Sequence, residues 1–292
     1  MASSKAAAAP SSGTGKVGFV LTLAEVMLGL VIIGLLIGVM LCTAEIIEIS
    51  RLRSQVSQIE KFDSAIQQFY SKFDGLPGDL ISVSADREGL PTGDGTPSHS
   101  DGDGKISPCN PGWQFNIGCE NALFWAQLAF TGYIDGDFNA DDALGDERLK
   151  NASVTLAPYI PTSAMGDGIY VTVWNTDGEQ PTAPPRVPYG NYFEITRINE
   201  VTDERIKETT GALTPVEAES IDDKIDDGMP TTGRIMVNGN TKWPEDTWGM
   251  MAKSGEDKCV APDDGYNTRN YFMAHRQLCH LAIVLICCDR KD

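Results

Sequence analysis

The sequence predicts an α+β fold in which one long N-terminal helix packs against an antiparallel β-sheet head with long loops. Two observations predict it. No glycine or proline interrupts the chain between Val39 and Lys72, which favours a single helix over that stretch. The candidate strands all lie later in the chain, and a helix followed by strands is typical of an α+β arrangement.

The first part of the predicted helix is apolar. After Glu25, residues 26–42 carry no charged side chain. Counted from Phe19, this run is about two dozen residues, or roughly 36 Å as a helix, which is enough to cross a bilayer. We therefore expect one helix over residues 19–73, with residues 19–42 crossing a membrane.

The second part of the predicted helix is amphipathic. Its apolar residues recur at steps of three and four, which is the spacing of one helix face. They are Ile49, Leu52, Val56, Ile59, Phe62, Ile66, Phe69 and Phe73. Residues 74–79 contain the first helix-breaking signals, so the head is expected to span residues 74–292.

Short helices and strands are expected within the head. Residues 120–130 carry apolar side chains at helical spacing, and residues 214–224 open with an N-cap threonine, Pro215 and the capping-box acid Glu217. Four segments are rich in aromatic and β-branched residues, as strands are. These segments are residues 169–174, 192–198, 233–237 and 281–287.

A single acid, Glu25, stands near the start of the apolar run. A carboxylate inside a membrane costs several kcal/mol, so it is a functional-site hypothesis with an expected partner. Before it, Lys5 and Lys16 are the only charged side chains of residues 1–18. This charge pattern predicts that the N-terminal end lies in the cytoplasm.

Composition and motifs narrow the function classes. The chain has 292 residues and a formal net charge of −18. An acidic surface disfavours nucleic acid, so no nucleic-acid partner is expected. The sequence holds no nucleophile elbow, no zinc-protease helix motif and no phosphate-binding glycine loop. We therefore expect that the protein is not an enzyme.

Two acidic segments of the head are candidate calcium loops. Asp101 and Asp103 lie in a segment similar to the middle of an Asp-x-Asp-x-Asp-Gly loop, and calcium prefers hard oxygen ligands of this kind. The candidate ligands of the second segment are Asp135, Asp137, Asn139 and Asp141. The alternative interpretation is a set of Asp-Gly turns on an acidic surface. No cofactor other than calcium is expected.

Seven cysteines are present, and disulfides would persist in a head that faces an oxidising compartment. Cys109 and Cys119 flank a short loop and are candidates for one bridge. Cys259 and Cys279 flank a turn-rich stretch near the C-terminus and are further candidates. The pairing stays open, because the cysteines of the head allow several connectivities.

The N-terminal segment resembles that of type IV pilins and type II secretion pseudopilins. The resemblance rests on Gly18-Phe19, on Leu23-Ala24-Glu25 and on the apolar stretch of residues 31–38. Further segments resemble a bacterial pilin-like subgroup and extend the resemblance over most of the chain. They are residues 53–63, 75–79, 124–128, 132–134, 213–218 and 221–228.

The resemblance implies processing, assembly and location. Residues 1–18 would be a prepilin leader, and a prepilin peptidase would cut after Gly18 and methylate Phe19. The mature helix would pack against other pilin or pseudopilin subunits in a filament built on an inner-membrane assembly platform. The protein would first be a single-pass inner-membrane protein with a periplasmic head, and then part of a periplasmic or cell-surface filament.

In the family, an acid near the helix start pairs with the terminal amine of a neighbouring subunit, so Glu25 is the expected assembly residue. It would be the seventh residue after the cut, whereas the family has its acid at the fifth. The alternative function is an uncleaved, single-pass, membrane-anchored extracytoplasmic domain that binds cations through its acidic loops. The sequence does not separate a pilus subunit from a secretion pseudopilin.

Overall fold

The computed structural model describes residues 22–92, 100–107, 119–139, 156–166, 168–176, 190–202, 205–238, 259, 266 and 280–285. The chain divides into two compact units, Met1–Glu48 and Ile49–Asp292. The first unit contains the start of helix α1. The second contains the rest of α1 and the other described helices and strands.

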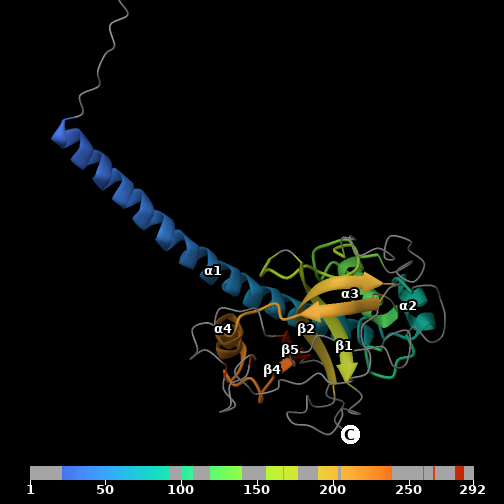
Figure 1. Cartoon of the computed structure of the whole chain (residues 1–292). Coiled ribbons are helices and arrows are strands. Elements are labelled where there is room, and N and C mark those ends of the chain that lie inside the picture. The colour runs from blue at the N-terminus through green and yellow to red at the C-terminus, as the bar shows by residue number, and fades with distance from the viewer. Residues whose placement is uncertain are drawn as a thin grey trace, which may run out of the picture. The chain divides into compact units, whose positions relative to one another are not determined.

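Helix α1, Leu23–Phe73, is the longest described element (Figure 1). Along residues 22–38 of the first unit, its large apolar side chains are all exposed to solvent. They are Leu23, Val26, Met27, Leu28, Leu30, Val31, Ile32, Ile33, Leu35, Leu36 and Ile37. Because these residues occupy nearly consecutive positions, they face every side of the helix.

The predicted membrane span is not found. Among the described residues, no helix combines the length and the apolar character that crossing a bilayer requires. The predicted fold class, in which residues 19–42 of a pilin-like helix span a membrane, is therefore wrong. The structure also differs from the prediction at the start of the helix: Thr22 caps α1, which begins at Leu23 and not at the predicted Phe19.

In the second unit, one face of α1 is buried. Leu52, Ile59, Phe62 and Ile66 of this face belong to one core cluster with residues of the sheet. Their spacing is that of the predicted amphipathic helix, so burial follows the sequence pattern here. The helix ends at Phe73, which confirms the predicted end.

Three shorter helices lie in the described part of the second unit. They are α2, Ser82–Glu88, α3, Cys119–Phe130, and α4, Pro215–Ile225. Both predicted head helices, α3 and α4, are thus present. At the start of α4, the Glu217 backbone N–H donates to the Thr214 hydroxyl, and the Thr214 N–H donates to the Glu217 carboxylate. This pair of hydrogen bonds confirms the predicted capping box.

The described strands form a five-stranded antiparallel sheet. They are β1, Ile169–Thr176, β2, Gly190–Thr202, β3, Arg205–Thr210, β4, Ile235–Asn238, and β5, His280–Val284. Strand β2 is central, because it pairs with β1 on one side and with both β5 and β3 on the other. The sequence predicted each of these strands except β3.

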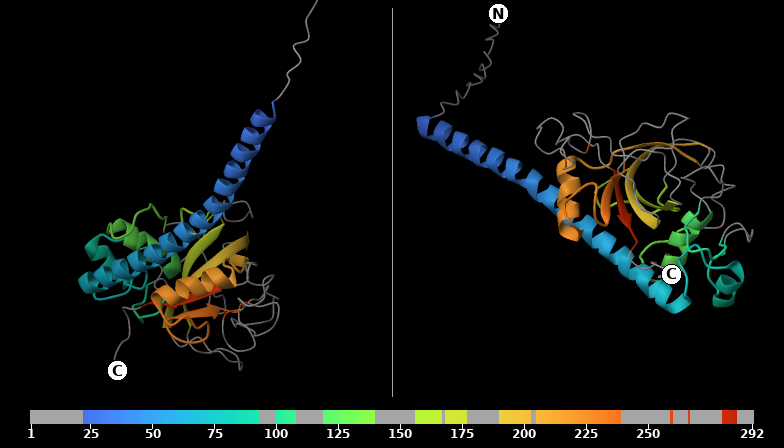
Figure 2. Two further views of the ribbon diagram at one scale, coloured as in Figure 1. Left: turned by 90° about the vertical axis from the view of Figure 1, so that its left-hand side faces the viewer. Right: turned by 90° about the horizontal axis from the view of Figure 1, so that it is seen from below.

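The core forms where α1 and α3 meet the sheet, and Figure 2 shows the C-terminal half of α1 beside the strands. Phe62 of α1 packs on Trp125 of α3 with ring centroids 4.9 Å apart. Trp125 stacks on Phe193 of β2 at 5.7 Å. Each aromatic pair contributes about 0.5–1.5 kcal/mol beyond the apolar area that it buries. This aromatic cluster fixes the second half of α1 on the sheet.

Candidate functional site

Glu25 lies in the first turn of α1 and caps its own helix. The backbone N–H and the hydroxyl of Thr22 donate to the Glu25 carboxylate at 2.8 and 2.9 Å. The Glu25 backbone N–H donates to the Thr22 hydroxyl at 3.4 Å, so the two residues form a capping box. These hydrogen bonds, the backbone one first, lower the pKa of the exposed Glu25 carboxyl. The helix therefore begins with a fixed negative charge.

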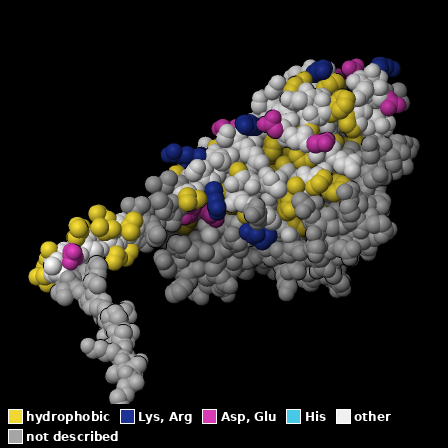
Figure 3. Space-filling view, turned by 90° about the horizontal axis from the view of Figure 1, so that it is seen from above, with side chains coloured by type: hydrophobic (Ala, Val, Ile, Leu, Met, Phe, Trp, Pro, Cys, Tyr) yellow, Lys and Arg dark blue, Asp and Glu magenta, His cyan; other side chains and the backbone are white. Residues whose placement is uncertain are grey.

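The N-terminal part of α1 is an exposed apolar surface, and Figure 3 shows yellow apolar side chains gathered over it. Within residues 22–38, Glu25 is the single charged side chain. The predicted processing residues Gly18 and Phe19 lie outside the described residues. What the described surface offers is apolar area on every side of a helix, with one carboxylate near its start.

Asp101 and Asp103 lie together, and the structure adds Asp79 to them. One carboxylate oxygen from each of the three lies within 4.8 Å of the other two. Asp79 is buried and the other two are exposed. The backbone N–H groups of Gly102, Asp103 and Gly104 donate to the Asp79 carboxylate at 2.8 to 3.1 Å. The loop therefore encloses a carboxylate from another part of the chain.

Glu120, in the first turn of α3, binds both ends of the acidic loop, residues 100–107. Its carboxylate accepts hydrogen bonds from the N–H groups of Ser100, at 3.0 Å, and Ser107, at 2.5 Å. The side chain is 1% exposed. Sequence reasoning missed both Asp79 and Glu120 as partners of the loop, because contacts between distant segments leave no local pattern.

Burial and mutual repulsion perturb these acids. Burial is the largest cause in both cases, and it raises the pKa of Asp79 to about 6 and of Glu120 to about 8. The charge of Asp101 adds to both shifts. A hard cation would neutralise this concentration of charge, while the N–H groups around Asp79 already stabilise the loop. The geometry around Asp79 thus fits a cation site, and it equally fits a turn that is stabilised by hydrogen bonds to the Asp79 carboxylate.

The second predicted calcium segment does not form a cluster in the described part of the chain. Asp135 and Asp137 are exposed, and neither belongs to a described group of three ionisable ligands that could share an ion. The Asn139 backbone N–H donates to the Pro158 carbonyl at 2.7 Å. Asp141 lies outside the described residues.

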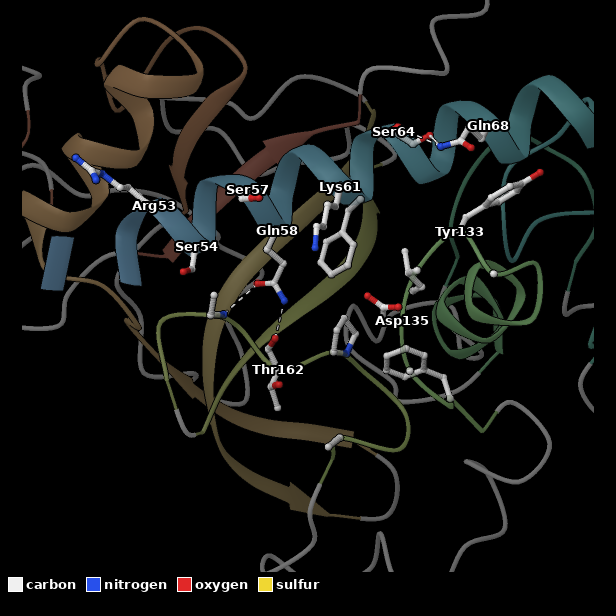
Figure 4. Close-up of a pocket in the computed structure, with 18 of the residues that line it drawn as sticks. Arg53, Ser54, Ser57, Gln58, Lys61, Ser64, Gln68, Tyr133, Asp135 and Thr162 are labelled. Carbon is white, nitrogen blue, oxygen red and sulfur yellow. Dashed lines mark hydrogen bonds between the residues drawn. The ribbon is translucent and has the colours of Figure 1, made fainter. Parts of the chain in front are cut away.

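A groove of about 920 Å³ runs along α1 in the second unit (Figure 4). Gln58 of α1 bridges it: its Nε2 donates to the Thr162 carbonyl at 2.8 Å, and the Ala164 N–H donates to its Oε1 at 3.0 Å. Arg53 and Lys61 give the same wall positive charge. The described lining residues include no histidine or cysteine, so they form no Ser–His or Cys–His pair for nucleophilic catalysis.

One of the four candidate disulfide residues can be placed. Cys259 is disulfide-bonded and 2% exposed. Cys119 begins α3, but its side chain lies outside the described part of the structure, as do Cys109 and Cys279. The predicted pairings stay predictions.

The sequence matches no protein-family model, and no curated protein or solved structure matches it either. The resemblance to pilin-like proteins rests on the N-terminal residues and segments quoted above. The apolar surface of α1 and the acidic clusters are the described features that bear on function.

Proposed function

We propose that this protein is a structural, non-enzymatic subunit of a filament of the type IV pilus or type II secretion pseudopilus class. It assembles through the apolar N-terminal part of α1, after a prepilin peptidase has removed residues 1–18. Other pilin-like subunits and an inner-membrane assembly platform are its further partners.

The observation that carries the proposal is the exposure of large apolar side chains around the whole circumference of α1. Monomeric proteins rarely expose an apolar patch of more than a few hundred Å², and larger patches mark interaction sites. Covering one such side chain contributes about 1.5–3 kcal/mol. Because one partner covers one side of a helix, residues 23–37 need several neighbours, as the core of a helical filament provides.

In such a filament, Glu25 would fix the axial stagger of neighbouring α1 helices. A carboxylate that becomes enclosed among apolar helices is strongly unfavourable unless a positive group pairs with it. Cleavage after Gly18 would create such a group, the free amine of Phe19. An amine–carboxylate pair between subunits would then select one stagger of neighbouring helices.

The processing step is tested by the N-terminal mass of the exported protein. We expect an N-terminus at Phe19, with the added mass of one methyl group. Gly18→Val should block the cut, whereas Gly13→Val, a matched change within residues 1–18, should leave it intact. A retained Met1, or a cut well after Cys42, contradicts the proposal.

A further inference from the structure

A second acidic cluster lies at the C-terminal end of α4. One carboxylate oxygen from each of Asp222, Asp226 and Asp227 lies within 4.8 Å of the other two. Asp222 is buried, Asp226 is partly buried and Asp227 is exposed. The cluster therefore reaches from the interior to the surface, which gives an ion a path of entry. The sequence patterns above assign no site to these three residues.

Protein donors hold the two outer carboxylates in place. Asp226 accepts hydrogen bonds from the backbone N–H groups of Arg234 and Ile235. Asp227 accepts one from the Met229 N–H at 2.9 Å. Donors of this kind orient metal-binding carboxylates and are a regular part of metal sites.

The surroundings of Asp222 support a bound ion separately from the clustering of the three carboxylates. The Asp222 Oδ2 accepts a hydrogen bond from the Tyr266 hydroxyl at 2.8 Å. The Gly228 backbone N–H also interacts with this carboxyl and lowers its pKa, against the larger effect of burial. The Oδ1 atom is nevertheless buried without a hydrogen bond of ordinary geometry among the described residues, and the side chain is 0% exposed. A buried carboxylate oxygen without a donor is costly. Such an atom calls for a further partner, and an ion is one.

The electrostatic surroundings favour a cation. Three carboxylates gather within 4.8 Å of one another, one of them buried, so negative charge is concentrated at this point. The C-terminus of α4 adds the negative end of a helix dipole. The guanidinium of the nearby Arg234 pairs with Asp63 at 2.6 Å.

We propose that Asp222, Asp226 and Asp227 bind one hard divalent cation, and that calcium is the cation that fits best. A ligand set of carboxylates favours calcium, magnesium or manganese over zinc or copper. Calcium accepts flexible geometry, whereas magnesium requires a near-ideal octahedron. The ion would join the end of α4 to the turn before β4. This proposal does not depend on the filament proposal.

Calorimetric titration of the full-length protein with calcium chloride, after EDTA treatment, tests the site. We expect saturable binding, and a loss of affinity of about tenfold or more in Asp227→Asn. Asp227 is exposed, so this variant is expected to fold. Asp222→Asn should abolish binding at this site, and its folding is checked by circular dichroism.

Two control variants make the result specific. Asp223→Asn alters the exposed neighbour of Asp222 and should leave the affinity unchanged. The double variant Asp101→Asn, Asp103→Asn alters the acidic loop around Asp79 and should also keep this binding event. Absence of calcium binding in the wild type, or wild-type affinity in Asp227→Asn, overturns the proposal. Loss of the binding in either control overturns it as well.

Discussion

At the residue scale, Glu25 caps its own helix, and under the filament proposal it also pairs with a neighbouring subunit. Its carboxylate accepts two hydrogen bonds from Thr22, so it serves the start of its own helix. The same carboxylate is exposed, so it also remains accessible to a neighbouring subunit. Capping of α1 requires both Thr22 and Glu25, whereas pairing between subunits requires only the charge of Glu25.

The capping role and the pairing role of Glu25 predict different effects of substitution on filament yield. We expect Glu25→Ala to reduce filament yield severely, because the charge that selects the stagger is lost. Thr22→Ala removes the cap but keeps the charge, so its yield should stay close to that of the wild type. Yield is measured by immunoblotting of sheared surface filaments against total cell protein. Equal loss in both variants would show that the cap, and not intersubunit pairing, is the function of Glu25.

Local contacts could be predicted from the sequence, whereas contacts between distant segments could not. The Thr214 capping box was predictable because all its contacts lie within four residues. The Thr22–Glu25 capping box carries the same local signal, a threonine followed by a glutamate three residues later, although it was not among the predictions. The grouping of Asp79 with Asp101 and Asp103 was not predictable, because it depends on two distant segments.

At the element scale, the end of α1 and the start of α4 follow from helix-end signals, but α1 begins at Leu23 and not at the predicted Phe19. Helix α2 and strand β3 were not predicted. Ile81, the residue before α2, makes no side-chain capping bond, so the start of this short helix carries no sequence signal. Strand β3, Arg205–Thr210, mixes charged and β-branched residues without clear alternation. Its place is determined by pairing with β2.

The turn after α1 packs directly on α3, and Gly78 makes this contact possible. Gly78 has φ +84°, and a Cβ there would collide with the backbone oxygen of Glu120. We expect Gly78→Ala to lower the free energy of unfolding by about 2–3 kcal/mol, from backbone strain and overpacking together. Urea denaturation followed by circular dichroism measures it.

Gly89 is the matched control for this variant. It has φ +70°, but a Cβ there meets no atom within 4 Å. Gly89→Ala should therefore carry only the backbone cost, about 1–2 kcal/mol. If the two variants lose the same stability, the close approach of the turn to α3 is not what Gly78 provides.

At the scale of the whole molecule, buried acids make stability depend on pH. Glu120 and Asp222 have folded-state pKa values of about 8 and about 7, above unfolded-state values of about 4. Between about pH 4 and pH 8 the folded chain thus binds more protons than the unfolded chain. The free energy of unfolding should fall as pH rises through this window.

Urea denaturation in EDTA at a series of pH values measures this dependence. Glu120→Gln removes one of the groups that titrate, so it should flatten the slope between about pH 6 and pH 8. The matched change Glu88→Gln, at an exposed position on α2, should leave the slope unchanged. A free energy of unfolding that rises from pH 5 to pH 8 would contradict the burial of these carboxyls.

Filament assembly requires that other subunits cover the apolar part of α1, and photo-cross-linking in cells tests this most directly. Ile32 and Ile81 are similarly exposed, at 49% and 53%, but only Ile32 lies on the proposed assembly surface. With benzoylphenylalanine at Ile32, we expect adducts between copies that join position 32 to residues 23–38 of another subunit. The same probe at Ile81 should give none to that segment. No intersubunit adducts from Ile32 would contradict assembly through α1.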